Sequence, residues 1–206
     1  MYRSTLKIFL FVFLWVVASA AHAAGKPVIL VLGDSLSAAY GMEHNTGWVS
    51  LLQKRLTSQD YPHRIVNASI SGDTTSGALA RVDRALDEHR PAIVIVELGG
   101  NDGLRGLPVD AMRANLAAII ERSLARGARV LLVGMQLPPN YGPAYTKRFR
   151  QVYVDLARHY SVTLLPFLLE GIADKPELMQ TDGVHPRAPA QARIMENVWE
   201  VLQPML

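Results

Sequence analysis

The sequence contains no cysteine among its 206 residues. This absence excludes disulfide bonds, thiolate metal sites and a cysteine nucleophile. Charge is also sparse, because only 19% of the residues are charged and the formal net charge is +3 with histidine counted as neutral. No run of five like charges occurs. A basic nucleic-acid-binding face is therefore not expected, and we expect no nucleic-acid partner.

The sequence also lacks the motifs that hold metals and nucleotides. Its histidines and carboxylates show no metal-ligand spacing, and neither G-x-x-x-x-G-K-[ST] nor G-x-G-x-x-G occurs. We therefore expect no metal and no cofactor. His44, His63, His89 and His159 fall in loops or at helix ends, and we expect them to be solvated surface residues.

The one strongly apolar segment that could suggest a membrane span lies at the N-terminus. Arg3 and Lys7 precede the apolar run Ile8–Ala18, and Ala21-His22-Ala23 forms a small-x-small cleavage site. This pattern predicts a secretory signal peptide over residues 1–23. The run is shorter than the roughly 20 residues of a membrane-spanning helix, and no cysteine can carry a lipid. We expect a periplasmic or secreted protein without a stable membrane anchor.

Residues 24–206 have the pattern of a single α/β domain. Five apolar segments are predicted strands: Val28–Leu32, Arg64–Ala68, Ala92–Leu98, Arg129–Gly134 and Val162–Leu165. Apolar residues at helical spacing follow each of them. A β-α unit repeated five times predicts a parallel sheet with helices on both faces. No long apolar stripe is left over, so we expect a monomer.

Local signals place two helices of this domain. Pro108 is expected to open a long helix with an apolar face that ends at Leu124, and Gly127 suits the position just after it. Asp73 is expected to cap the helix that begins near it. The stretch Gly99–Gly103 is expected to form a loop.

The first predicted strand leads into the turn Gly33-Asp34-Ser35, where the functional interpretation begins. In open α/β sheets, ligands bind beyond the carboxyl ends of the strands. Glycine lies beside serine, aspartate or asparagine after each of the first three strands, so polar groups gather at that edge. Ser35 is therefore a candidate nucleophile. The alternative is that Asp34 and Ser35 only cap the next helix, a common use of both residue types.

Later stretches supply what a serine nucleophile needs. A histidine must take the hydroxyl proton, and a carboxylate must fix the histidine tautomer. Asp182 and His185 lie three residues apart in a loop, so the carboxylate can reach Nδ1 and leave Nε2 for Ser35. The backbone N–H groups of Gly72 and Ser35 and the side-chain amide of Asn101 are candidate donors to an oxyanion.

Four short blocks together resemble the SGNH/GDSL hydrolase family. They are Gly33–Ser37, Gly72, Gly99–Asp102 and Asp182–His185, in the order that the family has. The predicted signal peptide and the stretch Ala38-Ala39-Tyr40-Gly41 look most similar to the bacterial periplasmic branch, which comprises multifunctional thioesterases, lysophospholipases and arylesterases. The G-x-S-x-G elbow of α/β-hydrolases is absent around Ser35.

The resemblance implies a flavodoxin-like three-layer α/β/α sandwich with a five-stranded parallel sheet. It also implies roles for particular residues. Ser35 would be the nucleophile, His185 the base and Asp182 its orienting carboxylate, while Ser35, Gly72 and Asn101 would form the oxyanion hole. Asp34 and Asp102, which neighbour these residues in the chain, are expected to make structural hydrogen bonds only.

Two apolar loops are candidates for the substrate-binding site. The residues concerned are Leu104, Leu107 and Pro108, then Met135, Leu137 and Tyr141 after the fourth strand. Their character predicts a groove for an acyl chain or an aromatic ring. The alternative is that half of them simply pack beneath the loops. Gly103 and Gly106 flank Leu104 and Arg105 and would let that loop move.

These observations favour a secreted, cofactor-free serine esterase that acts on small-molecule esters and thioesters, including aryl esters, acyl thioesters and lysophospholipids. One alternative is a carbohydrate-ester deacetylase on the same fold, which the apolar loops disfavour. The other is a non-catalytic binding module, which the complete set of serine, histidine, aspartate and asparagine disfavours. The fold alone would not decide among them.

Overall fold

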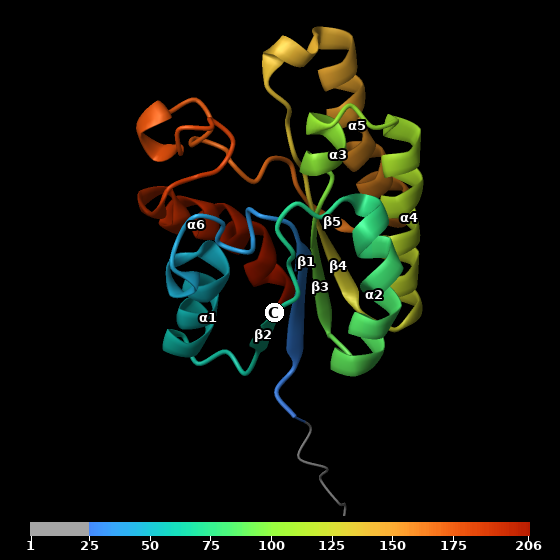
Figure 1. Cartoon of the computed structure of the whole chain (residues 1–206). Helices are drawn as coiled ribbons and strands as arrows, with labels where there is room; N and C mark the ends of the chain where they lie inside the picture. Colours follow the sequence, from blue (N-terminus) through green and yellow to red (C-terminus); the bar gives the residue numbers. More distant parts are fainter. Residues whose placement is uncertain (1–24) are drawn as a thin grey trace, which may run out of the picture.

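The computed structural model describes residues 25–206 (Figure 1), so the predicted signal peptide over residues 1–23 lies outside the described residues. The strands are β1 Val28–Gly33, β2 Arg64–Asn67, β3 Ile93–Glu97, β4 Arg129–Val133 and β5 Thr163–Leu165. The helices are α1 Trp48–Ser58, α2 Thr75–His89, α3 Gly100–Leu104, α4 Val109–Ala125, α5 Pro143–Tyr160 and α6 Gln191–Leu202. Short 3-10 turns span His44–Thr46, Pro139–Tyr141, Pro176–Leu178, Ala188–Ala190 and Gln203–Met205.

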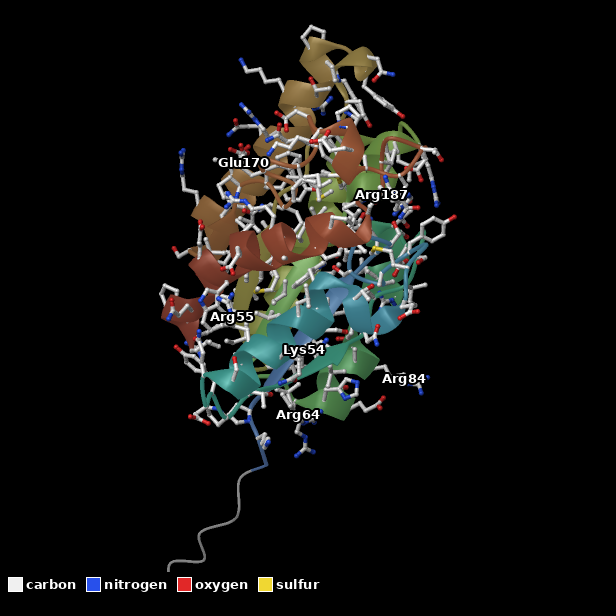
Figure 2. The ribbon with its side chains drawn as sticks, turned by 90° about the vertical axis from the view of Figure 1, so that its left-hand side faces the viewer. Lys54, Arg55, Arg64, Arg84, Glu170 and Arg187 are labelled. Carbon is white, nitrogen blue, oxygen red and sulfur yellow. The ribbon has the colours of Figure 1, made fainter. Side chains whose placement is uncertain are left out.

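The five strands form one parallel sheet in the order β2-β1-β3-β4-β5. Helices α1 and α6 cover one face, and α2, α4 and α5 cover the other (Figure 1). The predicted three-layer α/β/α sandwich is therefore confirmed. Figure 2 looks onto the layer of α1 and α6, where Arg55 of α1 forms an ion pair with Glu196 of α6.

Burial of the strands follows their place in the sheet. Every residue of β1 and β3 is buried, because these central strands are covered on both faces and read as continuous apolar runs. Strand β2 lies at the edge, and its first residue, Arg64, is exposed. A charged side chain on an edge strand opposes pairing with another chain.

The start of α2 differs from the prediction. Thr74 is the N-cap and accepts a hydrogen bond from the Gly77 N–H at 3.3 Å. Buried Asp102 accepts two more bonds, from the Thr75 N–H at 2.9 Å and the Thr75 hydroxyl at 2.6 Å. The prediction that Asp73 caps this helix was wrong, because its carboxylate pairs with Arg81 instead. The structural role predicted for Asp102 is confirmed.

Three further expectations need correction. The stretch from Gly99 is not a loop, because α3 begins at Gly100 and Gly99 supports the turn with φ 106°. Leu124 does not lie on the buried face of α4 but is 38% exposed, and Ser123 points inward instead. His63 is not a surface residue, because it is only 8% exposed, and burial lowers the pKa of its imidazole.

We predict that Asp102→Ala destabilises the protein by about 3 kcal/mol, because it leaves the buried Thr75 N–H and hydroxyl without their acceptor. Asp83→Ala serves as the control. Asp83 lies on the exposed side of α2 and pairs with Arg122 and Arg126, so its loss is expected to cost under about 1 kcal/mol. Urea unfolding of the three proteins measures both values, and equal losses would contradict the prediction.

Candidate active site

The site begins at the turn after β1. An ideal Cβ on Gly33 would lie 2.8 Å from Glu97 Oε2 and from Ser37 Oγ, so only glycine fits there. The Asp34 carboxylate accepts a hydrogen bond from the Leu36 N–H at 3.0 Å, which closes the turn around Ser35. The prediction that Asp34 makes a turn hydrogen bond is confirmed. Ser35 is mostly buried, and its side chain faces the loop that carries His185.

Ser35, His185 and Asp182 form one continuous chain of hydrogen bonds. Ser35 Oγ lies 2.9 Å from His185 Nε2, and His185 Nδ1 lies 2.7 Å from Asp182 Oδ2. The other carboxylate oxygen of Asp182 accepts bonds from the N–H groups of Val184 at 2.9 Å and His185 at 3.0 Å. The structure thus brings together the three residues that the sequence singled out.

These bonds also set the charge of the Asp182 carboxyl. Burial acts to raise its pKa, but hydrogen bonds from the backbone of His185 and Val184 and from the imidazole outweigh burial. The pKa of Asp182 falls to about 2. Asp182 is therefore a carboxylate at neutral pH, and it holds the imidazole with a proton on Nδ1.

The two other candidate oxyanion donors lie in helix α3 and in the loop after β2. Asn101, in the first turn of α3, borders the same cleft as Ser35 and donates one amide hydrogen to Asp34 Oδ2 at 3.0 Å. Gly72 has φ 80°, and its carbonyl accepts a hydrogen bond from Arg105 at 2.8 Å. The loop of Gly72 is anchored beside the turn, because the Ile70 N–H donates to the Gly33 carbonyl at 3.0 Å.

A cleft of about 590 Å³ opens beside Ser35. Of the predicted substrate-binding residues, Leu104, Met135 and Leu137 line it, whereas Leu107, Pro108 and Tyr141 lie outside its lining. The Tyr141 hydroxyl donates to the Leu104 carbonyl at 3.0 Å and so supports the cleft wall from behind.

Other parts of the lining were missed by sequence reasoning. Phe167, Leu169 and Met179 come from the segment between β5 and the His185 loop. The apolar run that continues past Pro166 was the available signal, but it has no period that assigns it to this edge. Glu170 and Asp174 also line the cleft, and no lysine or arginine of the described residues 25–206 does.

Glu97 is another residue that sequence reasoning missed. It closes strand β3 and is wholly buried, and its carboxyl accepts hydrogen bonds from Ser37 Oγ at 2.7 Å and the Asp34 N–H at 3.2 Å. Burial, and then the nearby Asp34 carboxyl, raise the pKa of Glu97 well above its ordinary value. Burial also raises the pKa of Asp34 to about 6, against the opposing hydrogen bonds from Leu36 and Asn101. Burial and the Asp34 carboxyl both favour the protonated form of Glu97.

Comparison with known proteins identifies the family of this chain. A parallel five-stranded sheet, with serine and histidine in contact at its carboxyl edge, is typical of serine hydrolases that cleave esters. The chain belongs to the GDSL-like lipase/acylhydrolase family, whose model matches residues 31–193. It is an ester-hydrolysing enzyme of that family.

Three relatives are similar over nearly their whole length. Esterase TesA of Pseudomonas aeruginosa is 51% identical over 183 residues, which cover 89% of this chain and 91% of that protein. An arylesterase of Vibrio mimicus is 45% identical over 89% of this chain and 92% of its own. Thioesterase 1/protease 1/lysophospholipase L1 of Escherichia coli K12 is 42% identical over 94% and 92%. The crystal structure of TesA superposes with a TM-score of 0.86 at 52% identity, covering 87% of this chain and 99% of that one.

We predict that Glu97→Gln becomes progressively more stable relative to the wild type as pH rises from 5 to 8. Native Glu97 holds a proton that the unfolded chain releases above its ordinary pKa, so wild-type stability falls as pH rises through this window. The slope is about 1.4 kcal/mol for each pH unit over which only the native carboxyl is protonated. Urea unfolding across this range measures it.

The matched control is Glu88→Gln, which changes an exposed carboxylate on α2. Its stability difference from the wild type is expected to stay flat over the same pH range. A flat difference for Glu97→Gln as well would mean that Glu97 is ionised in the native protein.

Proposed function

We propose that this protein is a secreted serine esterase that works through an acyl-enzyme. The supporting observation is the hydrogen-bonded chain from Ser35 through His185 to Asp182. Ser35 Oγ attacks the acyl carbonyl while His185 Nε2 takes the hydroxyl proton, and Asp182 stabilises the imidazolium that forms. His185 then gives the proton to the leaving group as the ester bond breaks. Water, deprotonated by His185, releases the acid and restores Ser35.

The negative oxygen of the tetrahedral intermediate is stabilised by three donors in this proposal. They are the N–H groups of Ser35 and Gly72 and the amide of Asn101. Asn101 is suited to this role because its bond to Asp34 occupies one amide hydrogen and leaves the other free. Since that bond also fixes the amide plane, the donor is oriented before substrate binds, and a single such donor is worth about 3 kcal/mol in the transition state.

The substrates that we propose are small-molecule carboxylic esters and thioesters, including aryl esters, acyl thioesters and lysophospholipids. The apolar walls from Leu104, Met135, Leu137 and Phe167 suit the acyl chain. Carboxylates line this cleft, and none of the lysines or arginines in residues 25–206 does. An anionic acyl group would therefore find no positively charged partner from these residues. Relatives named esterase, arylesterase and thioesterase support the same range.

We also propose that the protein is exported and that it is a monomer. The N-terminal segment of residues 1–23 has the pattern of a signal peptide, so we assign residues 24–206 to the periplasm or the exterior of the cell. Within residues 25–206, no helix is long and apolar enough to cross a membrane.

We predict that Ser35→Ala lowers kcat/KM for p-nitrophenyl butyrate by at least about 10⁴-fold, because it removes the hydroxyl that lies against His185 Nε2. It should also abolish labelling by a fluorophosphonate. Ser58→Ala, at the exposed end of α1, is the control and should behave as the wild type. Equal labelling of Ser35→Ala and the wild type would rule out Ser35 as the nucleophile.

We also predict that Phe167→Ala shortens the acyl preference. Loss of this wall residue should lower kcat/KM about 10-fold for p-nitrophenyl octanoate and much less for the acetate. Leu124→Ala, which truncates an exposed side chain on α4, is the control. An equal fall for both esters would argue against an acyl groove at Phe167, and wild-type activity confined to acetate would favour a carbohydrate-ester deacetylase.

A further inference from the structure

One aromatic side chain contacts His185 from outside the cleft. The ring of Tyr40 lies on the imidazole, with 4.6 Å between ring centroids and 41° between the ring planes. Tyr40 is nevertheless 51% exposed, and it is not among the residues that line the cleft. Its hydroxyl makes no hydrogen bond to any residue in the described part of the chain. An amphipathic ring beside the base is thus open to solvent.

The backbone holds this ring in place from two sides. The Tyr40 N–H donates to the Ser35 carbonyl at 3.2 Å, and the Tyr40 carbonyl accepts from Gln180 Nε2 at 3.0 Å. Gln180 is itself bonded to the His185 loop, because its N–H donates to the His185 carbonyl at 2.7 Å. The backbone of Tyr40 is therefore tied both to the Ser35 turn and to the His185 loop, which keeps the start of its side chain beside His185.

The reaction places the leaving group on the side of Tyr40. His185 Nε2 must hand its proton to the leaving oxygen, which puts that oxygen within about 3 Å of the imidazole edge. The acyl chain occupies the cleft, and the carbonyl oxygen faces the donors of Asn101 and Gly72. The fourth substituent of the tetrahedral carbon must leave in the remaining direction, past His185. A ring carried by that oxygen then comes within the 4.5–7 Å centroid separation of aromatic pairs with Tyr40.

We propose that Tyr40 is a specificity-determining residue that stacks on the leaving group of aryl esters. The ligand class is an aromatic alcohol such as a phenol, held against the exposed face of the Tyr40 ring. The inference rests on the proposed function, because it takes Ser35 as nucleophile and His185 as acid. When the ester C–O bond breaks, the proton on Nε2 passes to the phenolate oxygen, the phenol departs across Tyr40, and the acyl group stays on Ser35.

The test compares two esters that share one acyl group. Phenyl butyrate has an aromatic leaving group, and 2,2,2-trifluoroethyl butyrate has an activated alkyl one. We expect Tyr40→Ala and Tyr40→Leu to lower kcat/KM about 3- to 10-fold for the phenyl ester and less than about twofold for the alkyl ester. Tyr40→Phe keeps the ring and should stay near the wild type for both.

Two further measurements separate this role from a structural one. Hydrolysis of the butyryl-enzyme, followed in a single turnover, takes place after the phenol or alcohol has left, with Ser35 Oγ as its leaving group, and should be unchanged in Tyr40→Ala. The matched control is Tyr160→Ala, which removes another tyrosine whose ring contacts a histidine, His159, also at 4.6 Å, at the far end of α5. It should alter neither ester.

The outcomes are distinct. An equal fall for both esters, or slower hydrolysis of the butyryl-enzyme, would mean that Tyr40 positions His185 and would overturn the proposal. No change for either ester in Tyr40→Ala would overturn it as well. Fluorophosphonate labelling of the wild type and of Tyr40→Ala is measured in parallel. If the wild type does not label at Ser35, the proposed function fails, and that failure is separate from the behaviour of Tyr40.

Discussion

The arrangement of the candidate active site depends on the buried carboxyl of Glu97. The register of the sheet sets Gly33 of β1 opposite Glu97 of β3, and the space left by the missing side chain of Gly33 is filled by that carboxyl and by Ser37. Glu97 accepts bonds from the turn on both sides of Ser35, and Asp34 passes the connection on to Asn101. One polar network therefore joins the loops after β1 and β3. The two bonds to Glu97 Oε2 hold the turn on either side of Ser35, whereas Glu97 Oε1 is buried without a hydrogen-bond partner.

Sequence reasoning succeeded where the signal was local and the topology simple. Each strand was predicted to within one residue at either end, because buried parallel strands are continuous apolar runs. Ser35 and His185 were paired because a serine nucleophile needs a histidine base, and because the four short blocks resemble those of the SGNH/GDSL family. The helix α3 could not be predicted, since a five-residue segment that starts with Gly100 has no helical period and is held by tertiary contacts.

The cleft was only half predictable, for a related reason. Leu104, Met135 and Leu137 follow strands directly, so their place at the edge comes from the topology. Phe167 and Met179 belong to a long segment of turns, where neither a period of two nor one of 3.6 assigns a direction. The burial of His63 and the hydrogen-bonding role of Glu97 were missed because both depend on which neighbours the fold supplies, and a hydropathy pattern does not reveal individual contacts.

The separation of Ser35 and His185 along the chain has a consequence for synthesis. The two residues lie 150 positions apart, and helix α6, which packs on α1, follows His185. A growing polypeptide carries Ser35 long before it gains His185, which the proposed mechanism takes as the base. Partial products and fragments that stop before His185 would therefore lack the base that the proposed mechanism assigns to Ser35.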